Sequence, residues 1–398
     1  MIRDRLGPLL AAVTPLGRLV VAAGPVLWVV GAVLGWDELV VLGAAVCLLA
    51  AVCLVWLIGR TEAQAQVVLR GDHVVAGSVG AGGALRVTAP RGSRLAVRLE
   101  LALGGGTRSW RIGALSSGQV VDLDFDIATD RRGVIAIGPA VVVRDDPFGL
   151  FRRAKSWEQV RELFVHPVTA PLGPLGAGMI RDLEGYETPN LSPSDLAFHT
   201  LREYVPGDDY RHVHWGASAK LAATAAPGEQ ARFLVRQYLD TRRARLVVCL
   251  DADPAAYRSE VDFETAVSVA GSLAKRAVAD EVSLTVVTPT HVAHDASERQ
   301  AMDTLSRAVP VAAALVELTA RAAAVAPDAT AVLLLTGYAR NYRHLVEAVG
   351  QFPATVRRVA LAVDSEGAMS YRATEDLGLG CVRALADLHP LFEGRPLQ

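Results

Sequence analysis

The segment LREYVPGDDYRHVHWGASAKL, residues 201–221, concentrates the side chains of this chain that are suited to chemistry. Aromatic residues make up only 6% of the chain, yet three of them lie here among acidic, basic and imidazole groups. Such a set is compatible with a metal site, a catalytic site, a nucleic-acid surface or a surface that docks a protein. The candidate residues are Arg202, Tyr204, Gly207, Asp208, Asp209, Arg211, His214, Trp215, Ser218 and Lys220.

His212 and His214 are the candidate metal ligands of this segment. We expect a strand here, in which residues two apart share one face, so both imidazoles would lie beside Asp208 or Asp209. Imidazole and carboxylate groups suit a transition metal, but the spacing fixes no third ligand. A hydrogen-bonded polar network is the alternative that we favour. An enzyme of an unrecognised class that uses His212, His214 and Asp208 also stays open.

Charge and motifs argue against several function classes. The chain has 40 basic and 42 acidic residues, and Glu203, Asp208 and Asp209 offset the basic groups of the segment, so no positive field is left for nucleic acid. The sequence lacks GxxxxGK[ST], GxSxG and HExxH, and no GxGxxG opens a helix after a strand. We therefore expect no catalytic residues. Residues 201–221 are either a charged organiser between two domains or a docking face.

Two uncharged stretches near the N-terminus, residues 19–36 and 39–59, predict transmembrane helices. Each is long enough to cross about 30 Å of hydrocarbon, and lipid favours a helix there. Asp37 and Glu38 are expected at the turn between them. A cleaved signal peptide and a buried helical hairpin are the alternatives. Both chain ends are expected in the cytoplasm, because the flanks are basic: Arg3, Arg5, Arg18, Arg60 and Arg70.

The rest of the chain changes character in stages after the transmembrane hairpin of residues 1–60. Residues 66–169 contain short Val-rich strands separated by Gly and Ser, which predict an antiparallel β-sandwich. Residues 170–198 are rich in Pro and Gly and read as a linker. After the motif segment 199–240, apolar strands alternate with amphipathic helices over 241–398. That alternation predicts a mostly parallel α/β sheet covered on both faces.

Residues 201–221 resemble the central motif of the domain-of-unknown-function family 58, roughly R-x-Y-x-x-G-D-D-x-R-x-I-x-W-x-x-[ST]-A-[RK]. Upstream, RRGVIAIGPAVVVRDDPFGLFRRAK is similar to the family's RG-x-Y-x-[LI]-GP…DP-[FL]-GLF segment, and ELFVHP to a strand that ends in Tyr-Pro or His-Pro. Downstream, LVRQYLDTRRARLVVCLD resembles its approach to the α/β domain. With the two spans, the resemblance covers nearly the whole chain.

The family resembles a membrane-anchored von Willebrand factor type A domain, whose metal-ion-dependent adhesion site reads D-x-S-x-S after the first strand. Asp251 matches the leading Asp, whereas Asp253 and Ala255 replace the two serines. Thr336-Gly337 stands where Thr-Asp-Gly would supply a distant carboxylate. Because two ligands that a hard cation needs are replaced, we expect Asp251 and Asp253 to hold Mg²⁺ weakly at most. The alternative that we favour is that they cap the next turn.

Members of this family are commonly encoded beside a MoxR-type AAA+ ATPase, and often beside a transglutaminase-like membrane protein. The resemblance therefore implies an ATPase partner and a membrane-anchored, cytoplasm-facing adaptor or scaffold in protein-complex assembly or cell-envelope processes. The adaptor is expected to have no enzymatic activity and no cofactor. The alternative function is a divalent-cation-dependent ligand-binding module centred on Asp251 and Asp253.

Overall fold

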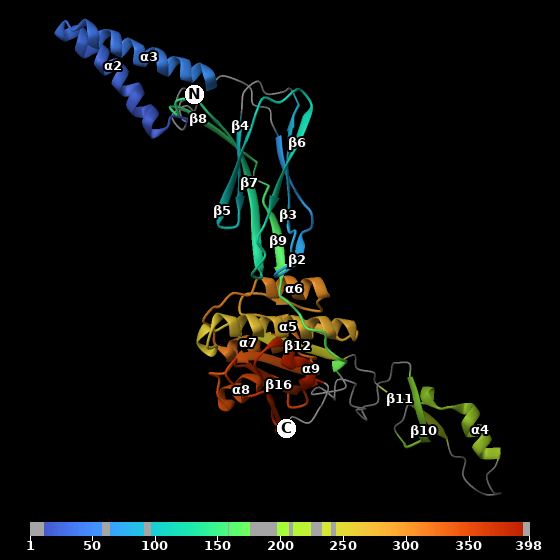
Figure 1. Ribbon diagram of the computed structural model, residues 1–398. Coiled ribbons are helices and arrows are strands. Elements are labelled where there is room, and N and C mark those ends of the chain that lie inside the picture. Colours follow the sequence, from blue (N-terminus) through green and yellow to red (C-terminus); the bar gives the residue numbers. More distant parts are fainter. Residues whose placement is uncertain are drawn as a thin grey trace. The chain divides into compact units, whose positions relative to one another are not determined.

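A computed structural model of the protein contains two compact units, Met1–His166 and Pro167–Gln398 (Figure 1). The first unit contains a helical hairpin and two β-sheets. The second contains a seven-stranded sheet with its helices and a small two-stranded module. The structure describes residues 12–57, 64–90, 97–157, 159–175, 197–206, 210–223, 233–239 and 244–392.

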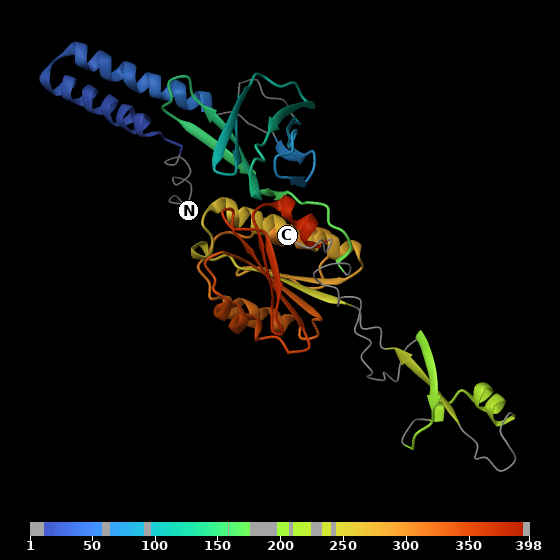
Figure 2. The same ribbon diagram turned by 60° about the horizontal axis from the view of Figure 1, so that its bottom comes forward.

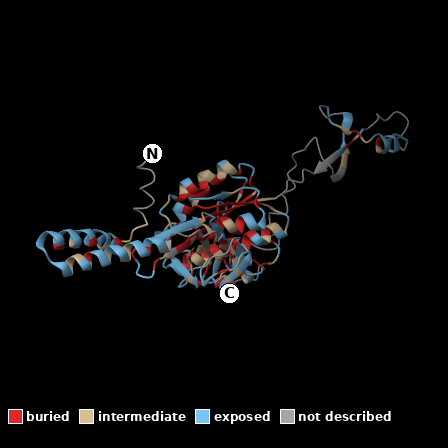
Figure 3. Cartoon of the chain, turned by 90° about the horizontal axis from the view of Figure 1, so that it is seen from above, coloured by how far each residue is buried: buried red, intermediate tan, exposed pale blue. Residues whose placement is uncertain are grey.

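The hairpin consists of α2 (Pro15–Leu34) and α3 (Asp37–Leu57). Both helices are long and apolar enough to cross a membrane, and most of their surface is exposed (Figure 3). Gly35, with a left-handed φ of 68°, ends α2 and turns the chain. The expected turn at Asp37 and Glu38 is wrong, because these residues lie in the first turn of α3, where acidic groups favour the helix dipole.

Glycines let α2 and α3 approach closely. A Cβ at Gly31 would lie 2.7 Å from the backbone nitrogen of Val40, and one at Gly43 would lie 2.5 Å from that of Trp28. Such close backbone approach is typical of membrane helices, which pack through small residues. The hairpin is therefore held by packing between its own helices rather than by burial in a globular core.

The expected strands of the first unit form two sheets. One has the order β1-β3-β6, from Gln64–Leu69, Gly82–Ala89 and Gln119–Asp126. The other has the order β2-β9-β7-β4-β5, from His73–Val75, Arg161–His166, Gly133–Asp145, Val97–Leu103 and Gly106–Ile112, and β8 (Arg152–Trp157) pairs with β7. Buried residues of both sheets, including Leu85, Phe125, Leu99 and Ile137, form one hydrophobic cluster.

The sheet of the second unit has the order β14-β13-β12-β15-β16-β18-β17. Its five central strands are parallel, and the two edge strands, β14 and β17, are antiparallel. The prediction of a mostly parallel α/β sheet is confirmed. The strands are β12 (Arg245–Leu250), β13 (Ser283–Val287), β14 (Val292–Ala293), β15 (Ala331–Gly337), β16 (Arg357–Val363), β17 (Ser370–Ala373) and β18 (Gly378–Val382).

Helices cover both faces of this sheet (Figure 2). One hydrophobic cluster joins the sheet to α5 (Glu260–Ala279), α6 (Glu298–Ser306) and α9 (Leu388–Phe392), and a second joins it to α7 (Leu315–Val325) and α8 (Tyr342–Val349). Leu172 and Leu175, at the start of the expected linker, are buried in the first cluster. Because the central strands are parallel, the loops after β12 and β15 meet at one edge of the sheet.

Candidate functional site

Residues 201–221 belong to a small module of two strands and one helix. Strand β10 (Ala197–Glu203) pairs antiparallel with β11 (Leu234–Leu239), and α4 (Trp215–Ala223) follows a 3₁₀ turn at Tyr210–His212. The expected strand through His212 and His214 is wrong, because a strand-like bridge is formed only by Val213, which lies between the turn and the helix. The two imidazoles therefore do not share a strand face. Gly207, Asp208 and Asp209 lie outside the described residues.

His214 and Ser218 fasten the helix to strand β11. The Nδ1 atom of His214 accepts a hydrogen bond from the backbone N–H of Ala217 at 3.1 Å, in the position of a helix cap. The buried hydroxyl of Ser218 donates to the His214 carbonyl oxygen at 3.0 Å and accepts from the Leu234 N–H at 2.8 Å. These bonds give both residues a structural role within the motif.

Four aromatic side chains of the module form two ring pairs, and three of the four rings are exposed. Tyr204 and Tyr210 stack with ring centroids 5.4 Å apart, and Trp215 meets the edge of Phe233 at 5.8 Å. Trp215 is 60% exposed and Tyr210 is 63% exposed. We call Tyr204, Tyr210, Trp215 and Phe233 the aromatic face.

The interior of this module is very small. Among its residues whose side chains the structure describes, Val213, Ser218 and Val235 are buried. Two strands and a nine-residue helix cannot bury large rings, and exposed apolar patches mark interaction surfaces. Arg211 and Lys220, which are exposed, add basic groups to the same module. The arrangement suits a protein contact, in which aromatic and Arg residues are enriched.

A second candidate site lies at the carboxyl edge of the central sheet, where Asp251 follows β12. The Asp251 side chain is only 2% exposed. One of its oxygens, Oδ2, accepts from the Thr336 hydroxyl at 2.8 Å, and the other, Oδ1, accepts from the Asp253 N–H at 3.1 Å. Asp253 in turn accepts from the Ala255 N–H at 3.0 Å. This geometry agrees with the alternative in which the two carboxylates cap the turn after the strand.

Arg340 supplies the positive charge of this site. Its Nε donates to Asp251 Oδ2 at 2.9 Å, and its Nη2 donates to Asp253 Oδ2 at 2.8 Å and to Asp251 Oδ1 at 3.3 Å. The hydrogen bond to Asp251 holds the pKa of the guanidinium above its ordinary value. The guanidinium therefore lies between the two carboxylates, where a divalent cation bound by both would also have to lie. The expected ligand set does not fit a metal while Arg340 stays in place.

A backbone hydrogen bond joins the two loops at this site, and a side-chain hydrogen bond closes the loop after β12. The Ala339 N–H donates to the Ala256 carbonyl oxygen at 3.1 Å, and the Tyr257 hydroxyl donates to the Asp251 carbonyl oxygen at 2.6 Å. Gly337 permits this approach, since a Cβ there would lie 2.1 Å from the Ala256 oxygen. Burial, with a further contribution from Asp251, raises the pKa of the Tyr257 hydroxyl well above its ordinary value, so this tyrosine stays a neutral donor.

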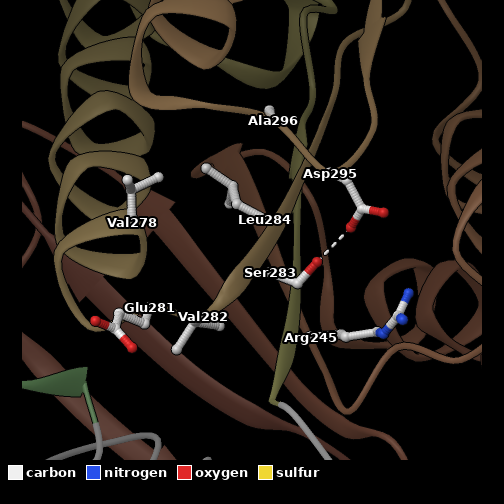
Figure 4. Close-up of a pocket in the computed structure, with 8 residues that line it drawn as sticks. All are labelled: Arg245, Val278, Glu281, Val282, Ser283, Leu284, Asp295 and Ala296. Atoms are coloured by element: carbon white, nitrogen blue, oxygen red, sulfur yellow. Dashed lines mark hydrogen bonds between the residues drawn. The ribbon is translucent and has the colours of Figure 1, made fainter.

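The opposite end of the sheet has a shallow hollow of about 390 Å³ between α5 and the start of β13 (Figure 4). The charged side chains that line it either bond to neighbouring residues or lie apart from one another. Arg245 pairs with Asp328 at 2.8 Å, and Asp295 accepts a hydrogen bond from Ser283. Glu281 lies on the other side of the hollow and does not converge with Asp295 (Figure 4). We assign no chemistry to this hollow.

Titration of the full-length protein with Mg²⁺ or Mn²⁺ should give no saturable binding at concentrations up to the order of 1 mM, the affinity range of weak oxygen-ligand sites. The reason is that the Arg340 guanidinium already pairs with both Asp251 and Asp253 and occupies the space between them. Isothermal calorimetry measures this directly. Asp251→Asn is the control: binding heat in the wild type that disappears in this variant would show that a cation displaces the guanidinium.

Comparisons with known proteins give little further guidance. No family model matches this chain, and no curated protein matches it. Among solved structures, a PKD domain of an M14-like peptidase from Thermoplasmatales archaeon SCGC AB-540-F20 is similar over 26% of this chain and 91% of that domain. The identity is 17% and the TM-score is 0.17. At this level of similarity the match supports no conclusion about function.

Proposed function

We propose that this chain is a membrane-anchored adaptor, without catalytic activity of its own, that docks a protein partner through the aromatic face. The observation that carries the proposal is the exposure of Tyr210, Trp215 and Phe233 on a module with almost no interior. Buried aromatic anchors provide much of the binding energy of protein interfaces. A partner that covered Trp215 and Tyr210 would complete the hydrophobic core that the module lacks.

The anchor in this proposal is the α2–α3 hairpin, and the basic flanks put both sheet-containing units in the cytoplasm. The two sheets of the first unit share one core, which supports a β-sandwich. In the second unit, the first strand in sequence, β12, lies inside the sheet between β13 and β15, and the short antiparallel β14 lies at its edge. This strand order supports a von Willebrand factor type A-like domain.

The partner that we propose is a MoxR-type AAA+ ATPase, as the resemblance of residues 201–221 to the family motif implies. The adaptor would hold the ATPase at the membrane, in protein-complex assembly or cell-envelope processes. A transglutaminase-like membrane protein is a further proposed partner. The sequence motifs support this division of labour, because the chain has no phosphate-binding loop of its own.

Trp215→Ala should abolish capture of the ATPase from native membranes and weaken binding of the purified ATPase by at least about thirtyfold, the usual loss at a central aromatic anchor. Affinity capture followed by mass spectrometry identifies the partner, and interferometry on detergent-solubilised protein measures the affinity. Tyr338→Ala is the matched control, because Tyr338 is also an exposed aromatic, at 45%, but lies after β15. If Tyr338→Ala lost binding and Trp215→Ala did not, the docking surface would be the carboxyl edge of the sheet and not the aromatic face.

Two other functions have distinct tests. A divalent-cation-dependent ligand-binding module requires the metal binding that the calorimetric titration measures at Asp251 and Asp253. An enzyme that uses His212, His214 and Asp208 requires turnover of an ester, peptide or phosphate substrate that Asp208→Ala abolishes. His214 favours the adaptor over the enzyme, because its Nδ1 atom already accepts a helix-capping hydrogen bond.

A further inference from the structure

The turn between β7 and β8 is fastened to the start of the helical hairpin. Thr14, the N-cap of α2, donates its backbone N–H to the Leu150 carbonyl oxygen at 3.0 Å and its hydroxyl to the Gly149 carbonyl oxygen at 2.7 Å. On the other side, the Arg152 N–H donates to the Ala12 carbonyl oxygen at 2.7 Å. These bonds fix the turn, residues 146–151, beside the point where the chain enters the first apolar helix.

Asp146 makes this turn rigid. Its carboxylate is 4% exposed and accepts the backbone N–H groups of Phe148, at 2.8 Å, and Phe151. Burial alone would raise the pKa of this carboxyl group, but the hydrogen bonds from the backbone outweigh it and hold the pKa below its ordinary value. The negative charge of Asp146 is thus stabilised by backbone N–H groups of the turn. The turn can therefore lie against an apolar helix.

The turn reaches beyond the first residue of the helix. Leu150 and Phe151 are 3% and 6% exposed and form one cluster with Cys53, against which Val20 of α2 packs. Val20 lies five residues into the helix, about 8 Å along its axis. Gly17 leaves space for the turn, because a Cβ there would lie 2.0 Å from the Leu150 carbonyl oxygen. If α2 spans the bilayer, the turn lies at the level of the lipid headgroups or below.

The exposed side chains of this region include one aromatic ring and several cations. Phe148, in the turn, is 59% exposed. Arg153 and Lys155 are exposed, and because they are two apart on β8 they share one face of the strand. Arg18, in the first turn of α2, is also exposed. The Lys155 ammonium nitrogen lies over the ring of Trp157, 5.1 Å from its centroid.

We propose that this turn and the start of β8 form a second contact with the membrane, which binds anionic phospholipid. Phe148 enters the interface between headgroups and acyl chains, and Arg153 and Lys155 bind headgroup phosphates. The inference rests on the proposed membrane anchor, since the hairpin is what brings the turn to the bilayer. Exposed apolar rings such as that of Phe bury at the boundary between headgroups and acyl chains, and basic groups next to a transmembrane helix are attracted to anionic lipid.

Hydrogen–deuterium exchange of the full-length protein in nanodiscs tests this contact. Backbone amides of residues 148–155 should exchange at least threefold more slowly in nanodiscs with 30% phosphatidylglycerol than in phosphatidylcholine alone. Arg153→Glu with Lys155→Glu should remove the difference. Arg108→Glu with Arg111→Glu is the matched control, because it makes the same charge change on β5 of the same unit and should leave the difference intact.

The outcomes separate the lipid contact from the anchor itself. Slow exchange along α2 and α3 in both lipid mixtures would establish the anchor. If α2 and α3 are protected but residues 148–155 exchange equally in the two mixtures, the lipid contact is overturned and the anchor stands. Rapid exchange along α2 and α3 would overturn both. Inorganic phosphate added to phosphatidylcholine nanodiscs should give no protection of residues 148–155. If it did protect them, the ligand of this turn would be a free anion rather than the bilayer, and the lipid contact would be overturned.

Discussion

Arg340→Ala should lower the free energy of unfolding of the α/β unit by about 3–5 kcal/mol, the usual cost of removing one partner from a buried ion pair. Asp251 is 2% exposed, and its two oxygens accept hydrogen bonds from Arg340 at 2.9 and 3.3 Å. Without the guanidinium, the carboxylate keeps its bonds from Thr336 and Asp253 but has no opposite charge. Chemical denaturation of the detergent-solubilised protein, followed by far-UV circular dichroism, measures the loss.

The control for this prediction is Arg258→Ala. Arg258 also pairs with a carboxylate, Asp364 at 2.6 Å, and lies 3.9 Å from the ring centroid of Tyr338, but its side chain is 34% exposed. Solvent screens such a pair, so we expect a loss of about 1 kcal/mol or less. Equal losses in the two variants would contradict the view that a buried charge is the cause.

A second substitution, at Asp251, distinguishes the contribution of charge at Arg340 from that of packing. Asp251→Asn removes the negative charge that Arg340→Ala leaves uncompensated, while it keeps the size of the side chain. In the double variant we therefore expect part of the lost stability to return, as a coupling energy in a double-mutant cycle. If the two losses simply added, the guanidinium would stabilise the unit through its packing rather than its charge.

The parts of the fold that depend on local pattern were predictable from the sequence. Two uncharged stretches of about 20 residues predicted the helices α2 and α3, and alternating strands and helices predicted the parallel sheet. The turn of the hairpin was misplaced because charge was taken as the signal. The structure shows that Gly35 ends the first helix, while Asp37 and Glu38 begin the second.

The candidate sites were harder to predict, because they depend on contacts between distant residues. Arg340 is 89 residues from Asp251 in sequence, and no local motif joins them. Its position four residues after Thr336, at the same edge of a parallel sheet, was the available signal. His212 and His214 were assigned to a strand because their alternation resembles one. In the structure, His212 instead lies in a 3₁₀ turn, and His214 caps the helix that follows.

The role of the DPFGLF sequence, residues 146–151, was also hard to predict from the sequence. It supported a resemblance, but its role could not be read from residue types, because Asp146 in a loop normally faces water. In the structure this carboxylate is buried and organises the turn that receives α2. Whether a polar residue is exposed or satisfied inside the protein depends on backbone N–H groups that only the folded turn brings together.

Gly337→Val should prevent the carboxyl edge of the sheet from forming as it does, and we expect a loss of at least about 3 kcal/mol in the free energy of unfolding, as for severe overpacking in a core. A Cβ at this position would lie 2.1 Å from the Ala256 carbonyl oxygen and 2.9 Å from the Tyr257 Cα. Both atoms belong to the backbone, so no side-chain rotation relieves the clash. The loop after β12 must move away, and the hydrogen bond from the Ala339 N–H to the Ala256 oxygen is lost.

Movement of this loop should also weaken the ion pair of Arg340. The loop carries Asp251 and Asp253, and Arg340 follows shortly after β15. Gly173→Ala is the control, since a Cβ there meets nothing within 4 Å, and we expect a change below about 0.5 kcal/mol, as at an ordinary surface position. Denaturation of both variants under identical conditions gives the comparison. A Gly337→Val protein as stable as the wild type would mean that the two loops separate at little cost, and Arg340 would then be free to leave the carboxylates for a cation or a partner.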